Sequence, residues 1–336
     1  MIIAGIDEAG YGPLLGPLVV SATAFEVGDV GPELPRAVAD TPCLWKILKP
    51  AVAKKHPAKK GRLLIADSKI VNGLTDGTKM LERGVLAFLR CMNPPADEMT
   101  ADQLLKMFGC TNHELTAHPW YAPAQLPLPW LADRGDLAIA TNILSGACLA
   151  AKVRPVCMRT AVVSERAYNR LVGNTNNKAS ALVSITLSHL YHLHTQFGHL
   201  GLVVGVDKQG GRDHYTNLLL ESFPEAQLKV IEESAEASCY MLQENATLDG
   251  QPVVRRTIIH FREKGESAFL PTALASMLCK YLRELCMHSF NNWWCQQIAG
   301  LRPTAGYYQD GSRWLVDVEP HLSRLGVQRE HLVRAR

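Results

Sequence analysis

Residues 1–22 have the sequence MIIAGIDEAGYGPLLGPLVVSA, and they contain the main signals for fold and site. An apolar run reaches two adjacent acids, Asp7 and Glu8, and a turn rich in glycine and proline separates it from a second apolar run. Two such runs joined by a turn predict an antiparallel pair of strands. Neighbouring side chains of a strand point to opposite faces. We therefore expect the first strand to end near Asp7, with Gly10 and Gly12 bending both carboxylates toward one place.

Downstream of this pair, strand-like and helix-like patterns alternate. Apolar runs predict strands at residues 154–164, 200–207, 226–234 and 253–263. Helical periodicity predicts helices at residues 75–91, 137–152, 165–197, 211–223 and 271–290. A hairpin followed by this alternation indicates an α/β fold, with a mixed β-sheet flanked by helices.

Composition limits the functional classes. The 336 residues are 47% hydrophobic and carry a net charge of +3, so the chain can form a core and any phosphate-binding surface must be local. The nine cysteines include no C-x-x-C pair, which favours reduced thiols over disulfides. Asp7 and Glu8 interrupt the N-terminal apolar run, and no run is long enough to span a membrane. We expect a cytoplasmic monomer without an organic cofactor or a membrane partner.

Two unusual tracts each have two interpretations. The basic tract AVAKKHPAKKGR, residues 51–62, is either a solvated surface or a contact with backbone phosphates. The tract HPWYAPAQLPLPW, residues 118–130, is rich in proline and aromatic residues and is neither a helix nor a central strand. Its aromatic residues either cover an edge of the core or form a platform for a nucleotide strand.

Two further acids lie where carboxylates are unusual. Asp207 ends the apolar run GLVVGVD, and the carboxyl ends of such strands are where α/β folds place their sites. Glu284 shares a helical stripe with Met277 and Tyr281, which makes it either a metal ligand facing the sheet or the partner of Lys280 in a surface ion pair. Carboxylates from separate elements suit Mg²⁺ or Mn²⁺, and two such ions can support phosphodiester cleavage.

The residues around these acids resemble those of a known family. Residues 5–22 are similar to the opening signature of the type 2 ribonucleases H, the ribonuclease HII and HIII group, in which a G-x-D-E-x-G-x-G turn precedes G-P and an apolar strand. Similar sequences follow in the family's order: ADSK at residues 66–69, GVDKQ at 205–209 and EKGESAFLPTALASMLCKYLRE at 263–284. Residues 166–190 resemble a stretch of the HIII branch, with similar residues at Tyr168, Asn169, Asn177, Leu182 and His189.

The resemblance implies a ribonuclease H-like fold in one domain, residues 1–336, with insertions near 28–61, 92–150 and 235–257. It also implies an endonuclease that uses Mg²⁺ or Mn²⁺ at a two-metal site. Its substrate would be the RNA strand of an RNA–DNA hybrid duplex, or a ribonucleotide embedded in DNA, and its products would have 5′-phosphate and 3′-hydroxyl ends. The implied catalytic and metal-binding residues are Asp7, Glu8, Asp207 and Glu284. The implied substrate contacts are Gly10, Tyr11 and Gly12 at the ribose 2′-hydroxyl, Ser68 and Lys69 at a phosphate, Lys264 near the scissile bond, and Tyr307 beside a sugar.

The sequence departs from the family at the glycine turn. Tyr11 stands where HII enzymes have arginine, and tyrosine can stack or form one hydrogen bond but cannot bind phosphate as arginine does. Two alternatives therefore stay open: a catalytically impaired binder of hybrids or RNA with the same fold, and a metal-dependent DNA nuclease or resolvase. The clustered acids argue against the binder, because clustered negative charge repels phosphate.

Overall fold

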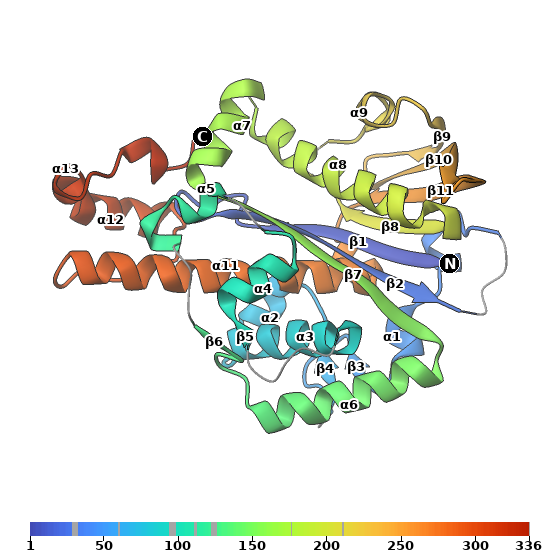
Figure 1. Ribbon diagram of the computed structural model, residues 1–336, viewed down its shortest axis with the longest axis horizontal. Coiled ribbons are helices and arrows are strands. Elements are labelled where there is room, and N and C mark those ends of the chain that lie inside the picture. Colours follow the sequence, from blue (N-terminus) through green and yellow to red (C-terminus); the bar gives the residue numbers. More distant parts are fainter. Residues whose placement is uncertain are drawn as a thin grey trace.

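The computed structural model of the protein describes residues 1–28, 33–59, 61–93, 99–110, 113–121, 126–175, 177–209 and 212–335. Within these residues a seven-stranded mixed sheet has the strand order β7-β2-β1-β8-β11-β10-β9 (Figure 1). Its strands are β1 (Ile2–Ala9), β2 (Leu18–Val27), β7 (Val153–Val163), β8 (Leu202–Asp207), β9 (Gln227–Glu233), β10 (Ala237–Leu248) and β11 (Gln251–Arg262). Two short pairs lie apart from it, β3 (Val52–Ala53) with β4 (Leu63–Leu64) and β5 (Met99–Thr100) with β6 (Pro127–Leu128).

Helices cover both faces of the sheet, which confirms the predicted α/β class. One layer contains α7 (Glu165–Thr175), α8 (Lys178–Phe197) and α9 (Thr216–Ser222), and the other contains α3 (Gly77–Met92), α6 (Arg134–Ala150) and α11 (Leu270–Gln297) (Figure 1). The other helices are α1 (Leu44–Ile47), α2 (Ser68–Asn72), α4 (Ala101–Met107), α5 (His113–Thr116), α10 (Gly265–Ala268), α12 (Tyr308–Val318) and α13 (Leu322–Leu325). Single 3₁₀ turns occur at Val38–Asp40, Pro119–Tyr121, Gly198–Leu200, Glu319–His321 and Arg329–His331.

Strand β1 lies at the centre of the sheet and fixes its geometry. It pairs antiparallel with β2, as the hairpin predicts, and parallel with β8, where Ile6 lies opposite Val206. Strand β8 in turn pairs parallel with β11. The carboxyl ends of β1, β8 and β11 therefore meet at one edge of the sheet, and the next residues along, Asp7 and Asp207, lie level with each other.

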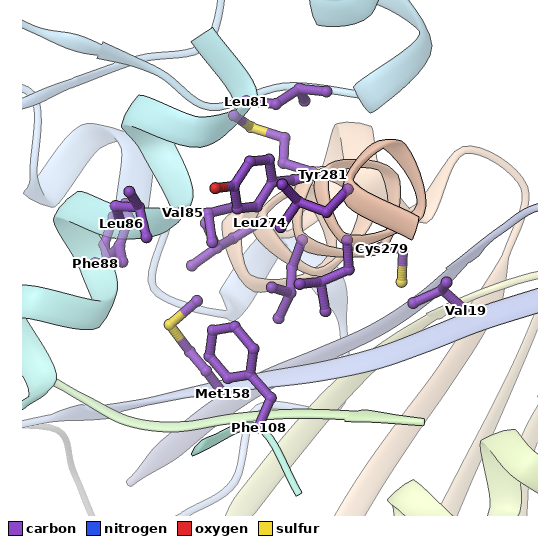
Figure 2. Packing of buried hydrophobic residues seen from close by; sticks show 14 of the residues in the cluster. Val19, Leu81, Val85, Leu86, Phe88, Phe108, Met158, Leu274, Cys279 and Tyr281 are labelled. Carbon is purple, nitrogen blue, oxygen red and sulfur yellow. The ribbon is translucent and has the colours of Figure 1, made fainter. Parts of the chain in front are cut away.

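Alternation along β1 divides its side chains between two hydrophobic cores. Ile2, Ala4 and Ile6 face the layer of α7, α8 and α9. Ile3 faces the layer of α11 and α3, whose core is larger. Figure 2 shows part of this larger core, in which Tyr281 and Leu274 of α11 pack against Val85 and Leu81 of α3, with Met158 of β7 nearby.

Helix α11 approaches the sheet closely because glycines face it. A methyl group at Gly5 would lie 2.1 Å from the backbone nitrogen of Thr272, so no larger residue fits there without a backbone shift. Hydrogen bonds fix the same contact, since the Thr23 hydroxyl donates to the Pro271 carbonyl (2.8 Å) and the Thr272 hydroxyl donates to the Gly205 carbonyl (3.0 Å). The start of α11 is thereby fixed across β2, β1 and β8.

Three sequence-based expectations are wrong in detail. Strand β1 does not end at its acids, because its pairing with β2 continues through Glu8 and Ala9. The helix expected over residues 165–197 is two helices, since the Asn177 side chain accepts hydrogen bonds from two backbone N–H groups and caps α8. Strand β10 was not expected at all, and it fills most of the segment treated as an insertion near 235–257.

The aromatic tract covers the core and does not form an open platform. Trp120 and Tyr121 are almost completely buried, at 2% and 6% exposure. Trp120 packs against Phe290, Trp293 and Trp294 of α11. For these two side chains the core-covering interpretation is therefore correct, and the nucleotide platform is wrong; Ala122, Pro123, Ala124 and Gln125 lie outside the described residues.

All nine cysteines are free thiols, as the absence of paired spacing predicts. In the part of the chain that the structure describes, no helix has the length and apolar character needed to cross a membrane.

Replacing Gly5 with alanine should destabilise the protein by about 1–3 kcal/mol or more, as overpacked cores commonly do. The reason is that both neighbouring groups are backbone and cannot rotate away. Urea or guanidinium denaturation measures this change. Gly146→Ala in α6 is the matched control, because a methyl group there meets nothing within 4 Å and should leave stability unchanged or raise it by about 0.5–1 kcal/mol. A Gly5→Ala variant as stable as the wild type would contradict the close approach of α11.

Candidate active site

A pocket of about 440 Å³ lies at the sheet edge where β1 and β8 end. Parallel pairing brings Asp7 and Asp207 to the same level, and Glu8 follows Asp7 on the opposite face of β1. Segments far apart in the sequence complete the pocket, which is lined by Asp7, Glu8, Lys54, Ala66, Asp67, Ser68, Lys69, Ile70, Asp207, Lys264, Glu266, Ser267 and Ser276. The structure thus gathers three of the four predicted ligands and three of the predicted substrate contacts.

Backbone N–H groups hold two of the acids in place. The Glu8 N–H donates to Oδ1 of Asp7 (2.8 Å), and the Gly265 N–H donates to Oδ1 of Asp207 (2.9 Å). Oε2 of Glu8 is buried and has no hydrogen-bond partner. A buried carboxylate oxygen without a partner is costly, so this atom is available to a ligand.

Burial raises the affinity of all three carboxylates for protons, and like charge adds to the effect. The pKa of Asp7 lies well above its usual value, first because the group is buried and then because Glu8 and Asp207 have the same charge. Burial, followed by repulsion from Asp207, raises the pKa of Glu8 to about 7. Burial also raises the pKa of Asp207. Such mutual repulsion is typical of a site that needs a positive ligand.

Two lysines from separate loops add positive charge to the pocket. Lys69 lies in the first turn of α2, where the Asp67 side chain accepts a hydrogen bond from the Lys69 backbone N–H (2.9 Å). Ser68 is fixed to α11 because its hydroxyl accepts a hydrogen bond from the Ser276 hydroxyl (2.9 Å). Lys264 precedes α10 with a left-handed backbone, φ 55°.

The glycine turn after β1 has a rigid part and an open part. Gly10 has φ 85°, and a methyl group there would lie 2.6 Å from the Pro17 carbonyl oxygen, so the fold itself requires this glycine. A methyl group at Gly12 would meet nothing within 4 Å among the described residues. The fold therefore does not explain Gly12, and close approach by a ligand would.

The C-terminal segment clamps this turn, which the sequence did not indicate. The buried guanidinium of Arg334 donates hydrogen bonds to the carbonyls of Gly10 and Tyr11, and it lies 4.1 Å from the ring centre of Tyr168. The Asn169 side chain anchors the same segment, donating to the Glu330 and Val333 carbonyls (both 2.8 Å). An arginine charge thus reaches the turn from 323 residues away in the sequence.

The remaining residues shared with the HIII-like stretch have structural roles. Asn177 caps α8, Leu182 is buried, and the His189 ring contacts the Val20 carbonyl (3.1 Å). Tyr11 lies near Tyr168, Glu8 and Arg334, and partial burial raises its pKa.

Tyr307 is half exposed and lies 5.6 Å from the guanidinium of Arg283. Its neighbour Gly306 accepts hydrogen bonds from the Leu14 and Leu15 N–H groups (2.8 and 3.1 Å), so Tyr307 lies close to the loop that follows the glycine turn.

Glu284 is not among the residues lining the pocket; its carboxylate forms an ion pair with Lys280 one turn earlier in α11. This is the surface pair that the sequence offered as the alternative. Among the described residues, no three His, Cys, Asp or Glu side chains are already arranged to hold a metal ion.

The comparison with solved structures finds ribonuclease HII and H2 chains at low sequence identity and low TM-score. The ribonuclease HII of a PCNA complex from Archaeoglobus fulgidus is 14% identical, with a TM-score of 0.44 over 100% of this chain and 95% of that one. The ribonuclease H2 from Pyrococcus horikoshii OT3 is 13% identical, with a TM-score of 0.36 over 99% and 92%. No family model and no curated protein matches the sequence.

A buried acid outside the pocket supports the loop that follows the turn. Oε1 of Glu165 accepts hydrogen bonds from the Gly16 N–H (3.0 Å) and the Tyr121 hydroxyl (2.9 Å). Burial raises the pKa of Glu165 to about 7. The folded protein therefore holds a proton at this carboxyl between pH 4.5 and 7, whereas the unfolded chain releases it, and stability falls as the pH rises through this window.

Glu165→Gln should remove this loss of stability at higher pH. Relative to the wild type, the free energy of unfolding of the variant should rise between pH 5 and pH 8 by about 2.5 kcal/mol, most of the ~3.4 kcal/mol that a pKa rise from 4.5 to about 7 represents at about 1.4 kcal/mol per pH unit. Denaturation at both pH values measures the difference. Glu225→Gln, on an exposed turn, controls for the substitution itself. A difference between Glu165→Gln and the wild type that is equal at pH 5 and pH 8 would contradict the assignment.

Proposed function

We propose that the protein is a metal-dependent endonuclease that hydrolyses the RNA strand of RNA–DNA hybrids, or ribonucleotides embedded in DNA. The observation that carries the proposal is the convergence of Asp7, Glu8 and Asp207 in one pocket with Lys69 and Lys264. Clustered carboxylates flanked by lysines suit a reaction at a phosphodiester, in which cations hold the phosphate and carboxylates hold a metal.

The donor set fits a hard divalent cation such as Mg²⁺ or Mn²⁺. All three acids offer carboxylate oxygens, the unpartnered Oε2 of Glu8 is free to coordinate, and a cation would relieve the repulsion among the three groups. When bound, one or two such ions supply positive charge beside the phosphate and activate water for attack. Glu284 enters the proposal as a fourth ligand through the family resemblance, and it would first have to leave Lys280.

The protein's own groups would position the substrate. Lys69 and Lys264 would bind phosphate oxygens, and Ser68, held by Ser276, would keep the Lys69 loop in place. Asp207, fixed by the Gly265 N–H, would keep its second oxygen directed to the reaction centre. These contacts supply orientation, which is a large part of phosphoryl-transfer catalysis.

The glycine turn is the proposed means of distinguishing RNA from DNA. Its backbone at Gly12 is uncovered, so a ribose 2′-hydroxyl could approach closely enough for a hydrogen bond. Arg334 would hold the turn in position from behind by binding the Gly10 and Tyr11 carbonyls. Tyr11 and Tyr307 are the proposed contacts for the adjoining sugars.

Cleavage of three labelled duplexes in Mg²⁺ or Mn²⁺ tests the proposal. An RNA–DNA hybrid and a DNA duplex with one ribonucleotide should be cut, leaving 5′-phosphate and 3′-hydroxyl ends, and an all-DNA duplex should not. Asp7→Asn and Asp207→Asn should lower the rate at least about 10³-fold, because each removes a proposed ligand at the reaction centre. Glu284→Gln should cost less, because Glu284 is paired outside the pocket.

Circular dichroism and thermal melting show whether these variants fold. Glu26→Gln, an exposed ion-pair residue on β2, is the control and should cleave at the wild-type rate. Cleavage of the all-DNA duplex would indicate a DNA nuclease, and tight hybrid binding without cleavage would indicate a binder. Full activity of folded Asp7→Asn would refute the site.

A further inference from the structure

A basic groove adjoins the candidate active site, and we propose that it binds the phosphate backbone of the duplex flanking the cleaved bond. We define the basic groove by Lys55, His56, Lys59 and Lys79, which line or border a second pocket of about 270 Å³. The inference rests on the proposed function for the identity of the duplex. Three of the four groove residues come from the segment near 28–61 that the family resemblance leaves unmatched, and Lys79 comes from α3.

The chain runs directly from the active-site pocket into the groove. Strands β3 and β4 pair in parallel, with Val52 opposite Leu63. The rest of the basic tract connects these two strands in the sequence. Lys54 follows β3 and lines the active-site pocket, whereas His56, two residues later, lines the second pocket. Two residues span at most about 7 Å. A stretch of only two residues therefore joins the linings of the two pockets.

Internal contacts hold the walls of the groove. Arg83 forms an ion pair with Asp136 (2.6 Å), and Arg62 donates hydrogen bonds to the Val52 carbonyl. Lys54 donates to the Ser267 carbonyl, with its ammonium group 4.8 Å from the ring centre of Trp45. The first contact joins α3 to α6, the second joins the end of the tract to β3, and the third joins Lys54 to α10, next to Lys264.

The side chains that define the groove are available to bind a ligand. In the described part of the chain, the side chains of Lys55, His56, Lys59 and Lys79 have no hydrogen bond or ion pair. Three lysines without partners therefore line or border this second pocket, and two more, Lys69 and Lys264, line the active-site pocket. Among the described residues, the acids that line this second pocket are Asp76 and Asp136, and Arg83 forms an ion pair with Asp136.

The repeating phosphates of a nucleic-acid backbone suit a surface with several separate cations. Successive phosphates of one strand rise about 3.4 Å along the duplex, so a strand held at Lys69 would place further phosphates over the groove within a few nucleotides. Lysines that contact phosphates contribute affinity without reading sequence. The groove should therefore increase affinity for a flanking duplex in a way that depends on salt and on flank length.

The triple variant Lys55→Ala, Lys59→Ala, Lys79→Ala tests the proposal. Fluorescence anisotropy in EDTA, with a hybrid carrying long flanking duplex on both sides, should show at least about tenfold weaker binding. The slope of log affinity against log salt should fall by about 2 to 3, close to one for each lost phosphate contact. With a hybrid cut back to the bases around the cleavage site, the variant should bind as the wild type does.

The matched control is Lys106→Ala, Lys229→Ala, Arg256→Ala, which removes the same charge from surfaces elsewhere. Lys229 lies opposite Met241 on β10, toward the far end of the sheet from Asp207. If both triple variants lose equal affinity, net charge explains the effect and the groove is refuted. Unchanged duplex binding by the groove variant, with loss of binding only to phosphatidylglycerol vesicles, would also overturn it.

These outcomes separate the groove from the proposed function. Binding that depends on the groove, in a protein that cleaves none of the three duplexes, would leave the groove standing and refute the nuclease. Normal cleavage and normal long-flank binding by the folded groove variant would refute the groove alone.

Discussion

The parallel pairing of β1 with β8 is the constraint on which the site depends. It places the carboxylates of Asp7 and Asp207 at one edge of the sheet, where burial and like charge make both unfavourable. The fold maintains this arrangement with tight packing behind it: Gly5 admits the backbone of α11, and hydrogen bonds from Thr23 and Thr272 fix the helix across three strands. At functional sites, the packing of the surrounding fold commonly holds charged groups in electrostatically unfavourable positions.

The same packing explains how distant segments reach the pocket. Helix α11 brings Ser276 to Ser68, which sets the position of Lys69 at the start of α2. The loop after β11 brings the Gly265 N–H to Asp207 and leaves Lys264 beside it. The site is thus assembled from the ends of β1 and β8, one short helix and one loop.

Much of this arrangement could be predicted from sequence because the signals are local. Buried strands such as residues 200–207 are recognised by their apolar runs, and Asp207 by its position at the end of one. Strand β10 was missed because its residues mix polar and apolar types on a partly exposed hairpin. The end of β1 was misplaced because acids at Asp7 and Glu8 suggest a break, whereas the ladder with β2 tolerates them.

Contacts between residues distant in sequence gave no local signal. Nothing near Arg334 indicates that it clamps the turn at Gly10, and the ion pair of Lys280 with Glu284 was one of two interpretations that spacing alone could not separate.

The central claim is that Asp7, Glu8 and Asp207 share a divalent cation. A crystal soaked in Mn²⁺ tests it most directly, through the anomalous difference map. The account predicts a peak within coordinating distance of all three carboxylates, and a map with no peak in that pocket would contradict it.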